Sequence, residues 1–462
     1  MATAPRTQQV IDGIRSRIAA RLLCAGDRLP SVRQSAARFG VSPATVVEAY
    51  DRLVADGVIQ AVPRSGFFVS HLASAPAGPA ANAPRRDHAI DPFWVSRQSL
   101  DESGAVAMPG CGWLPADWMP QAALQRGLRE AMRDPANLLH YGSTAGDPAL
   151  RRQIALRFAG EGLVCDPDRI LLTASGSAAA DLICRLLLRP GDTVLLDDPC
   201  YFNYQALVAA HAARAVSVPF GPSGPDPAVF AAVVAAERPR LYLTNSGVHN
   251  PTGGALALPT AHRLPGLAAA HGMVIVEDDI FADFAPGRPT MAALDGLSGV
   301  IRIGSFSKTI SAAVRCGYIA ARPEWIDALA DLQLATGFGG PSPLASAAIG
   351  HVLGQGAYRR HMEQLRRKLD RARRHSAQAL ASLGLTVSGA DGAGFTLWCR
   401  LPAGLDSAAL AQRCLAHGVI LAPGNVFSPS QSAAPFLRWN VAQTSPAALD
   451  ALAKAMAAES AG

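Results

Sequence analysis

Lys308 is the residue whose surroundings point most clearly to chemistry. It lies in the run Ile303-Gly304-Ser305-Phe306-Ser307-Lys308-Thr309, and Arg315 follows seven positions later. A lysine amine can form a Schiff base with a carbonyl compound, whereas hydroxyls and a guanidinium are donors that suit a phosphate group. The run therefore predicts a lysine that forms a Schiff base beside a bound phosphate.

Apolar runs of the length expected for strands alternate with helical stretches from Pro92 onward. The runs cover residues 170–173, 193–196, 241–244, 274–276 and 300–303. Short buried strands between helices predict a mostly parallel, doubly wound sheet, and such sheets bind ligands beyond the carboxyl ends of their strands. The candidate residues follow these runs: Gly176, Ser177, Tyr201, Asn250, Asp278 and Lys308.

These motifs occur in the order found in fold-type I pyridoxal-phosphate (PLP) enzymes, and the chain resembles that aminotransferase family over about residues 105–450. The resemblance is carried by Asn250-Pro251-Thr252-Gly253, by Asp278 at a strand end and by the Lys308 run. It implies an α/β domain over residues 92–462, with a large doubly wound sheet and a smaller C-terminal α+β subdomain. It also implies pyridoxal 5'-phosphate as the cofactor.

The resemblance assigns a role to each candidate residue. Lys308 would form the Schiff base and, if chemistry runs, shuttle protons. Tyr201 would stack on the pyridine ring, Asn250 would hydrogen-bond its phenolic oxygen, and Asp278 would pair with its nitrogen. The phosphate would be held by hydroxyl, backbone and guanidinium donors from Gly176, Ser177, Ser305, Ser307 and Arg315.

Two further residues extend the resemblance. Arg438, in Phe436-Leu437-Arg438-Trp439, would bind the α-carboxylate of an amino acid, for which the bidentate geometry of arginine is suited. Tyr141, in an early loop, would reach the phosphate bound by the neighbouring subunit. This role of Tyr141 implies a domain-swapped homodimer.

The sequence departs from the family pattern at two places. A tyrosine often stands two or three positions after the aspartate, and here those positions are Ile280 and Phe281. We therefore expect an altered pKa for the Schiff base at Lys308. A glutamine is often found where this chain has Ser177 or Ala178, so the contact expected there rests on a serine hydroxyl at most.

The first seventy residues have a different pattern. Ser31 and Gln34 form a capping-box pair at a helix start, Gly40 is a stop signal, and Ser42-Pro43 opens a second helix. An earlier helix is predicted over residues 7–23. Two short strands, 58–62 and 66–69, follow the helices with a basic tip at Arg64. The pattern predicts a winged helix-turn-helix.

Residues 6–70 closely resemble the GntR-type winged helix. They hold nine arginines against five acidic residues, a net charge of +4 that suits contact with phosphates. By this resemblance, the residues that would touch double-stranded operator DNA are Ser31, Arg33, Ser42, Thr45, Arg64 and Gly66. Ser31 and Ser42 are helix caps whether or not DNA is bound, and an arginine is frequent in the family where this chain has Pro43.

Composition supports a soluble cytoplasmic protein of several domains. The chain has 462 residues, is 49% hydrophobic and 17% charged, and carries a net charge of +6. Its eight cysteines form no CxxC pair, which argues against a metal knuckle or a disulfide framework. No signal peptide or membrane span is predicted. We expect a DNA-binding domain over residues 1–70, an Ala/Pro-rich linker over 71–91 and the PLP domain over 92–462.

Together the two halves resemble the MocR subgroup of GntR-type transcriptional regulators. The resemblance implies a regulator that senses an amine or amino acid through aldimine exchange at Lys308, with low or absent turnover. Two alternatives remain open: an active aminotransferase with a tethered DNA-binding head, and a sensor of PLP itself. Arg438 favours an α-amino acid as the effector.

Overall fold

The computed structural model describes residues 6–20, 22–63, 65–70, 93–101, 106–288 and 290–460. The chain divides into two compact units, and the boundary between them falls between Asp87 and His88. Arg64 and the linker predicted over residues 71–91 lie outside the described residues. Each unit is described by itself below.

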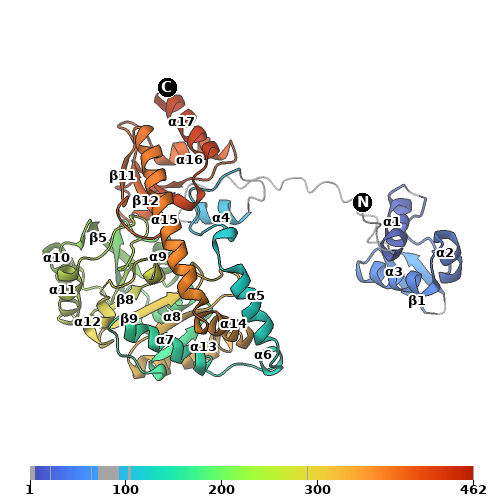
Figure 1. Cartoon of the computed structure of the whole chain (residues 1–462), viewed down its shortest axis with the longest axis horizontal. Helices are drawn as coiled ribbons and strands as arrows, with labels where there is room; N and C mark the ends of the chain where they lie inside the picture. Colours follow the sequence, from blue (N-terminus) through green and yellow to red (C-terminus); the bar gives the residue numbers. More distant parts are fainter. Residues whose placement is uncertain are drawn as a thin grey trace. The chain divides into compact units, whose positions relative to one another are not determined.

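The N-terminal unit is a three-helix domain with a two-stranded wing (Figure 1). Its elements are α1 (Arg6–Ala19), α2 (Val32–Phe39), α3 (Pro43–Ala55), β1 (Ile59–Val62) and β2 (Gly66–Val69). Its own core includes Val10 and Ile14 from α1 and Val46, Tyr50 and Leu53 from α3, all of which are buried. This unit therefore has the winged helix-turn-helix fold that the sequence predicted.

Side-chain caps fix the ends of α2 and α3. Ser31 accepts a hydrogen bond from the backbone of Gln34, whose side chain in turn accepts from the Ser31 backbone, so the predicted capping box is present. Gly40 ends α2 with a left-handed φ of 64°. Ser42 caps α3 through the backbone of Thr45, and Pro43 occupies the first turn.

The first helix is shorter than the sequence suggested. It ends at Ala19, and Leu22, which falls within the helix predicted over residues 7–23, is 67% exposed. The chain turns at this point because Leu23 and Leu29 take the remaining core positions. The segment around Arg28 then pairs with Phe68 as an extra bridge beside the wing.

The second unit is built on an eight-stranded sheet in the order β3-β10-β9-β8-β7-β4-β5-β6. Strands β4, β5, β7, β8 and β9 are parallel to their neighbours of that set, whereas β10 runs antiparallel between β9 and β3. The strands are β3 (Ile170–Thr173), β4 (Thr193–Asp198), β5 (Arg214–Gly221), β6 (Gly224–Pro225), β7 (Leu241–Thr244), β8 (Val274–Asp278), β9 (Val300–Ser305) and β10 (Gly317–Ala320).

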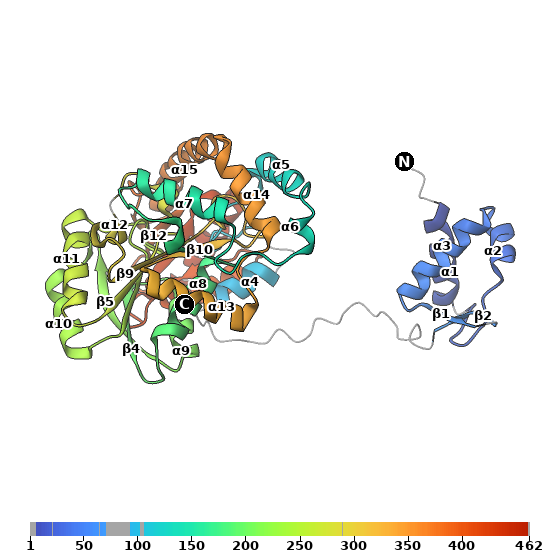
Figure 2. The same cartoon turned by 90° about the horizontal axis from the view of Figure 1, so that it is seen from below.

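Both faces of this sheet are buried, which explains why its strands read as continuous apolar runs. In β3, Leu172 packs into one core cluster and Leu171 into the other, and the same alternation recurs along β4, β7 and β9. Helices cover the two faces (Figure 2). One face packs on α7 (Pro148–Gly160), α10 (Pro227–Glu237), α11 (Leu258–Ala269) and α12 (Met291–Asp295); the other packs on α8 (Gly176–Leu187), α9 (Phe202–Ala210) and α13 (Pro323–Gly337).

A smaller subdomain follows at the C-terminal end. Its antiparallel sheet has the order β11-β12-β14-β13. The long helix α15 (Ala357–Ser382) runs from α14 (Pro343–Gly354) to this sheet (Figure 1). The other elements are β11 (Thr386–Ser388), β12 (Thr396–Arg400), α16 (Ser407–Leu415), β13 (Ala422–Pro423), β14 (Phe436–Asn440) and α17 (Pro446–Ser460). The predicted large and small parts of the PLP-type fold are both present.

In the described part of this unit, α7 is preceded in the chain by three α-helices: α4 (Trp94–Asp101), α5 (Gln121–Ala131) and α6 (Ala136–Leu139). Helix α5 packs on α14. None of the helices in the described ranges is long and apolar enough to cross a membrane. Of the eight cysteines, Cys24 in the N-terminal unit is exposed and the other seven are buried.

Candidate functional site

The predicted site residues of the large unit, with the exception of Tyr141, gather around one cavity of about 290 Å³. It opens beyond the carboxyl ends of the parallel strands, where doubly wound sheets bind ligands. The residues expected at the cofactor that line it are Gly176, Ser177, Tyr201, Asn250, Asp278, Ser305, Ser307, Lys308 and Arg315, and Arg438 lines it as well. The fold thus brings residues from distant parts of the sequence into a single site.

Lys308 presents its amine inside this cavity. Its Nζ donates a hydrogen bond to the carbonyl oxygen of Gly112 at 2.6 Å. Burial lowers the pKa of Lys308 to about 8, and the positive charge of Arg438 contributes to this lowering. A lysine with such a pKa is partly neutral near neutral pH, and the neutral amine is the form that attacks a carbonyl carbon.

Asp278 lies at the end of β8 on the cavity wall. Tyr204 donates its hydroxyl to Oδ2 of Asp278 at 2.7 Å, and the backbone N–H of Ile280 donates to Oδ1 at 3.1 Å. Burial raises the pKa of Asp278, and these hydrogen bonds partly oppose that effect. A buried carboxylate that faces a cavity is suited to pair with a cationic ring nitrogen.

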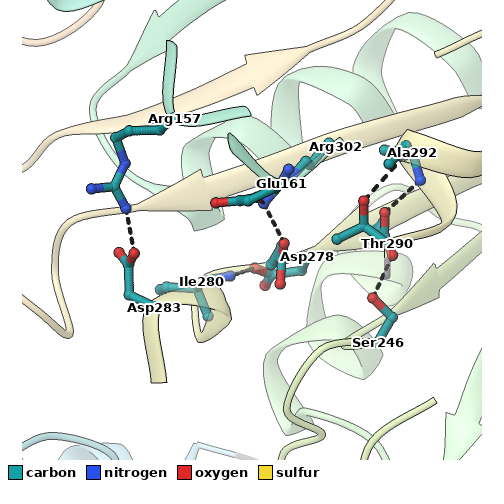
Figure 3. A network of polar contacts seen from close by, with 12 residues as sticks. Arg157, Glu161, Ser246, Asp278, Ile280, Asp283, Thr290, Ala292 and Arg302 are labelled. Carbon is teal, nitrogen blue, oxygen red and sulfur yellow. Dashed lines mark hydrogen bonds and ion pairs between the residues drawn. The ribbon is translucent and has the colours of Figure 1, made fainter. Parts of the chain in front are cut away.

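The two acidic neighbours of Asp278 have structural partners of their own, and Figure 3 shows three of those partners, Ser246, Ala292 and Arg302, around Asp278. Glu277 accepts hydrogen bonds from Ser246 and from the first backbone N–H groups of α12. Asp279 forms a buried ion pair with Arg302 at 2.5 Å, and Arg302 also pairs with Glu161. Among these three consecutive carboxylates, Asp278 is the member that lines the cavity.

Arg438, on β14, is a cation that lacks an anionic partner among the described residues. It is 2% exposed, and it donates to the carbonyl of Gly110 at 2.6 Å and to Oδ1 of Asn250 at 3.1 Å. Its Nε has no hydrogen-bond partner within the described part of the chain. Burial lowers the pKa of Arg438 to about 10, and no carboxylate is among the groups that favour its charge. A ligand carboxylate would supply the missing anion.

The opposite end of the cavity offers donors for a phosphate. Ser305 and Ser307 are linked by a hydrogen bond of 2.8 Å between their hydroxyls, and both line the cavity. Gly176 and Ser177 form the first turn of α8, whose backbone N–H groups attract anions. Arg315 lines the same end in a left-handed conformation with φ of 55°. Such strain in a non-glycine residue is typical of functional sites.

Tyr141 does not reach this cavity. Its ring is 81% exposed, and its centroid lies 4.9 Å from that of Phe338. Tyr141 therefore has no role in the cavity of its own chain, and its predicted role in a neighbouring subunit stays a prediction.

The candidate DNA-contact residues lie on the surface of the N-terminal unit. Ser31, Ser42 and Gly66 are exposed, as is Arg33, and Thr45 is partly exposed at the start of α3. Arg28, which the sequence did not single out, lies beside Gly66. Arg64 cannot be placed because it lies outside the described residues.

Two family models match the chain. The model of bacterial regulatory proteins of the gntR family matches residues 6–69, and the model of aminotransferase class I and II matches residues 114–456. The uncharacterized HTH-type transcriptional regulator YdcR of Escherichia coli K12 is 31% identical over 451 residues, which cover 94% of both chains. The chain is a GntR-family regulator of the MocR subgroup.

Proteins similar to this regulator match it either over both units or over the larger unit. A protein named as a probable rhizopine catabolism regulatory protein, MocR of Rhizobium meliloti, is 28% identical and covers 91% of this chain and 87% of its own length. The structure of LysN, the α-aminoadipate aminotransferase of Thermus thermophilus, superposes with a TM-score of 0.71 at 25% identity and covers 79% of this chain and 95% of that chain. The aminotransferase fold of this GntR-family regulator implies pyridoxal phosphate, and its helix-turn-helix domain implies DNA binding.

The site of this regulator includes residues, in the cavity lining or in contact with it, that the sequence alone did not reveal. Tyr204 donates to Asp278, Asn245 lines the cavity directly after β7, and Gly112 accepts from Lys308. The position of Asn245 after a predicted strand was an available signal. Tyr204 lies three residues after Tyr201, on the first turn of α9, and this spacing was a second signal. No sequence signal pointed to Gly112, because only the tertiary fold brings it to Lys308.

The two residues that replace the usual tyrosine of the family have different surroundings in this MocR-type chain. Ile280 lines the cavity, so an aliphatic side chain stands near Asp278. Phe281 is buried against Phe284 and Phe395. The phenol donor expected in the family is therefore replaced by apolar surface on this side of the cavity.

Proposed function

We propose that this regulator binds pyridoxal phosphate at Lys308 and senses an amino acid or amine there, so that binding changes the affinity of its head for operator DNA. The observation that carries the proposal is the cavity itself. It combines a lysine of lowered pKa, a buried aspartate and a buried arginine without an anionic partner in the described part of the chain. These three groups match the carbonyl, the ring nitrogen and the carboxylate of the two expected ligands.

The cavity residues fit the cofactor group by group. Pyridoxal phosphate supplies an aldehyde that reacts with amines and a ring that withdraws electrons. Asp278, kept in place by Tyr204, would keep the ring nitrogen protonated. Tyr201 would lie against the ring and Asn250 would donate to its phenolic oxygen. The phosphate would be held by Ser305, Ser307 and Arg315, with Gly176 and Ser177 at the start of α8.

The effector would be held by residues that are already in place. Arg438 would bind the α-carboxylate, and Lys308 would give up its bond to the cofactor in favour of the effector's amine. The Lys308 amine released in this exchange has the carbonyl of Gly112 within hydrogen-bond distance. A change of partners at Lys308 and Arg438 is a local event that can bias a larger equilibrium.

A working aminotransferase with a tethered head is the second candidate. The presence of Lys308, Asp278, Asn250 and Arg438 in one cavity favours it. The apolar Ile280 and Phe281, in place of a phenol, favour slow chemistry instead. A sensor of PLP itself is the third candidate. It would not need Arg438, because PLP has no α-carboxylate for this arginine to bind.

The deciding experiment is an absorbance titration of the PLP-loaded full-length protein with amino acids and amines, repeated with operator DNA. We expect some amino acids to change both the cofactor spectrum and the DNA affinity, with a coupling of about 1–3 kcal/mol. Arg438→Ala should abolish the response to amino acids and leave basal DNA binding intact. Keto-acid production at roughly 1 per second or faster would favour the aminotransferase instead.

A further inference from the structure

The cavity contains no charge, among the described residues, beyond those that the cofactor and an α-amino acid would use. Its charged lining residues are Asp278, Lys308, Arg315 and Arg438. Each of them already has a partner on the ring, the aldehyde, the phosphate or the α-carboxylate. What this chain has left to offer the side chain of an effector is therefore the uncharged rest of the lining.

Helix α4 supplies one side of this remaining lining. Val95, Ser96, Ser99 and Leu100, here called the α4 wall, all line the cavity. Val95 and Ser99 are four positions apart, as are Ser96 and Leu100, so the members of each pair are neighbours on the helix surface. Val95 and Ser99 are buried, whereas Leu100 is 74% exposed and stands at the rim.

Ser99 has a hydroxyl that is not satisfied. Its Oγ is buried and has no hydrogen-bond partner among the described residues. Buried hydroxyls are normally paired, and an unpaired one in a cavity wall indicates a partner that arrives with a ligand or with a shift of the helix. The α4 wall is thus neutral, with aliphatic groups and an unused hydroxyl.

The other side of this lining is apolar too. Ile280, Phe281 and Phe395 line the cavity, and the last two form an edge-to-face contact with centroids 5.6 Å apart. A charged effector side chain placed between this surface and the α4 wall would lose its water without gaining an opposite charge. An aliphatic, aromatic or hydroxyl side chain would lose nothing comparable.

We propose that the α4 wall reads the effector side chain, and that the effector is an α-amino acid whose side chain is uncharged. The proposal rests on the proposed function, because it needs the cofactor at Lys308 and the carboxylate at Arg438. Helix α4 is also the first described element of the large unit along the chain. The α4 wall therefore belongs to the element of this unit that is nearest in sequence to the head.

The test uses the full-length protein loaded with PLP and follows the cofactor absorbance during titration with single amino acids. The probes are L-valine, L-leucine and L-methionine against L-glutamate and L-lysine. At least one uncharged probe should reach half-saturation at a concentration about tenfold or more below both charged probes.

A matched pair of variants locates the selectivity at the α4 wall. Leu100→Arg places a cation at the rim, and its high exposure means that the fold tolerates the change. It should lower the half-saturation concentration of L-glutamate about two- to fivefold. Gln98→Arg adds the same charge to the same helix at a residue that does not line the cavity, and it should leave that concentration unchanged.

Three outcomes overturn the proposal in distinguishable ways. If L-glutamate or L-lysine acts on the native protein as strongly as the uncharged probes, the effector class is wrong. If both arginine variants lower the half-saturation concentration of L-glutamate equally, the α4 wall does not select the effector side chain. If the protein takes up PLP but no amino acid changes its spectrum, this proposal fails while cofactor binding stands. A protein that never acquires the cofactor absorbance refutes the proposed function itself.

Discussion

Two buried cations, Lys308 and Arg438, share the cavity, and the charge of one acts on the proton affinity of the other. Arg438 helps to hold the pKa of Lys308 at about 8, well below the ordinary value for lysine. In this arrangement the positive charge of Arg438 is not neutralised by any carboxylate in the described part of the chain. The two residues are thus prepared for ligands that bring an aldehyde and a carboxylate.

The lowered pKa of Lys308 predicts the pH dependence of cofactor capture. Because the neutral amine is the reactive form, the rate of PLP uptake by the apo-protein should rise with pH and level off above about 8. Arg438→Ala removes a positive neighbour, so the pKa of Lys308 and the midpoint of the profile should move up. Stopped-flow absorbance from roughly pH 6 to 10 measures this shift.

An exposed arginine gives the control for this experiment. Arg133 pairs with Glu130 on the surface, and Arg133→Ala should leave the profile unchanged.

Since Lys308 binds its proton more weakly in the folded state than when unfolded, the stability of the apo-protein should rise with pH between about 8 and the pKa of an unfolded lysine. An uptake profile that is flat between about pH 7 and 9 would contradict the assignment of Lys308.

Tyr204 is predicted to position Asp278 for the cofactor. Tyr204→Phe removes a hydrogen bond to a buried carboxylate, a change worth about 1.5–3 kcal/mol. We expect PLP affinity to fall at least about tenfold, with the pKa of Asp278 raised further because the phenol holds it down. Fluorescence or absorbance titration of the apo-protein with PLP measures the affinity.

Tyr242 offers the matched control. It donates to the buried Asp197 at 2.6 Å, and neither residue lines the cavity. Tyr242→Phe should lower the unfolding temperature but leave PLP affinity near that of the native chain. Equal losses of PLP affinity in both variants would mean that Tyr204 acts through stability alone.

At the scale of elements, α2 and α3 form the predicted DNA-reading surface, and the arginines of the head divide into two kinds. Arg52 on α3 is paired with Glu48 at 2.6 Å, and Arg15 on α1 is paired with Asp56 at 2.6 Å. Arg33 on α2 is exposed and forms no ion pair with the described residues. An unpaired arginine is the one available to a phosphate or a base.

Arg33→Ala should therefore weaken DNA binding more than Arg52→Ala does. If Arg33 contacts a phosphate, the slope of log affinity against log salt should fall by about 1. If it contacts a base, discrimination between operator and random DNA should fall instead. Fluorescence anisotropy at several salt concentrations separates these results, and equal effects of the two variants would remove Arg33 from the interface.

Local signals account for what the sequence predicted among these elements. The caps at Ser31 and Ser42 and the stop at Gly40 were predicted correctly because they depend on neighbouring residues. The five predicted strands of the large sheet are also confirmed, since burial of both faces leaves continuous apolar runs. The end of α1 was wrong because Leu22 and Leu23 are equally apolar and only the packing decides between them.

The cofactor end of the cavity and Arg438 could be predicted, whereas the surface that would meet the effector's side chain could not. Asn250, Asp278 and Lys308 carry motifs of their own, so resemblance located them. Helix α4 has no such motif, and its path across the cavity depends on the tertiary fold. The same is true of Gly112, which meets Lys308 across 196 positions of sequence.

At the scale of the whole molecule, the large unit leaves apolar residues exposed around Tyr141. Tyr141 contacts Phe338, which is 67% exposed, and Leu138 and Leu139 at the end of α6 are exposed as well. Such groups in solvent are typical of a protein–protein interface. They support the predicted homodimer in which Tyr141 reaches the partner's cofactor phosphate.

Phe338→Asp should convert the dimer to a monomer, because it places a charge in an apolar contact. PLP should then be held more weakly, by about 1.5–3 kcal/mol if one hydrogen bond from Tyr141 to the phosphate is lost. Light scattering measures the mass and dialysis measures cofactor retention. Leu156→Asp, at an exposed leucine on α7, is the control and should change neither. A native chain that is monomeric at micromolar concentration would contradict the homodimer.

The placement of the thiols makes the native chain suitable for site-specific fluorescent labelling. Seven cysteines are buried in the large unit, where burial raises the thiol pKa of those such as Cys184 and Cys399 and slows alkylation. Cys24 is exposed in the DNA-binding unit. A maleimide dye should therefore label the head at Cys24 without any engineered residue. Energy transfer between two heads of an assembly, or from a head to end-labelled DNA, can then report ligand-driven movement in the unmodified sequence.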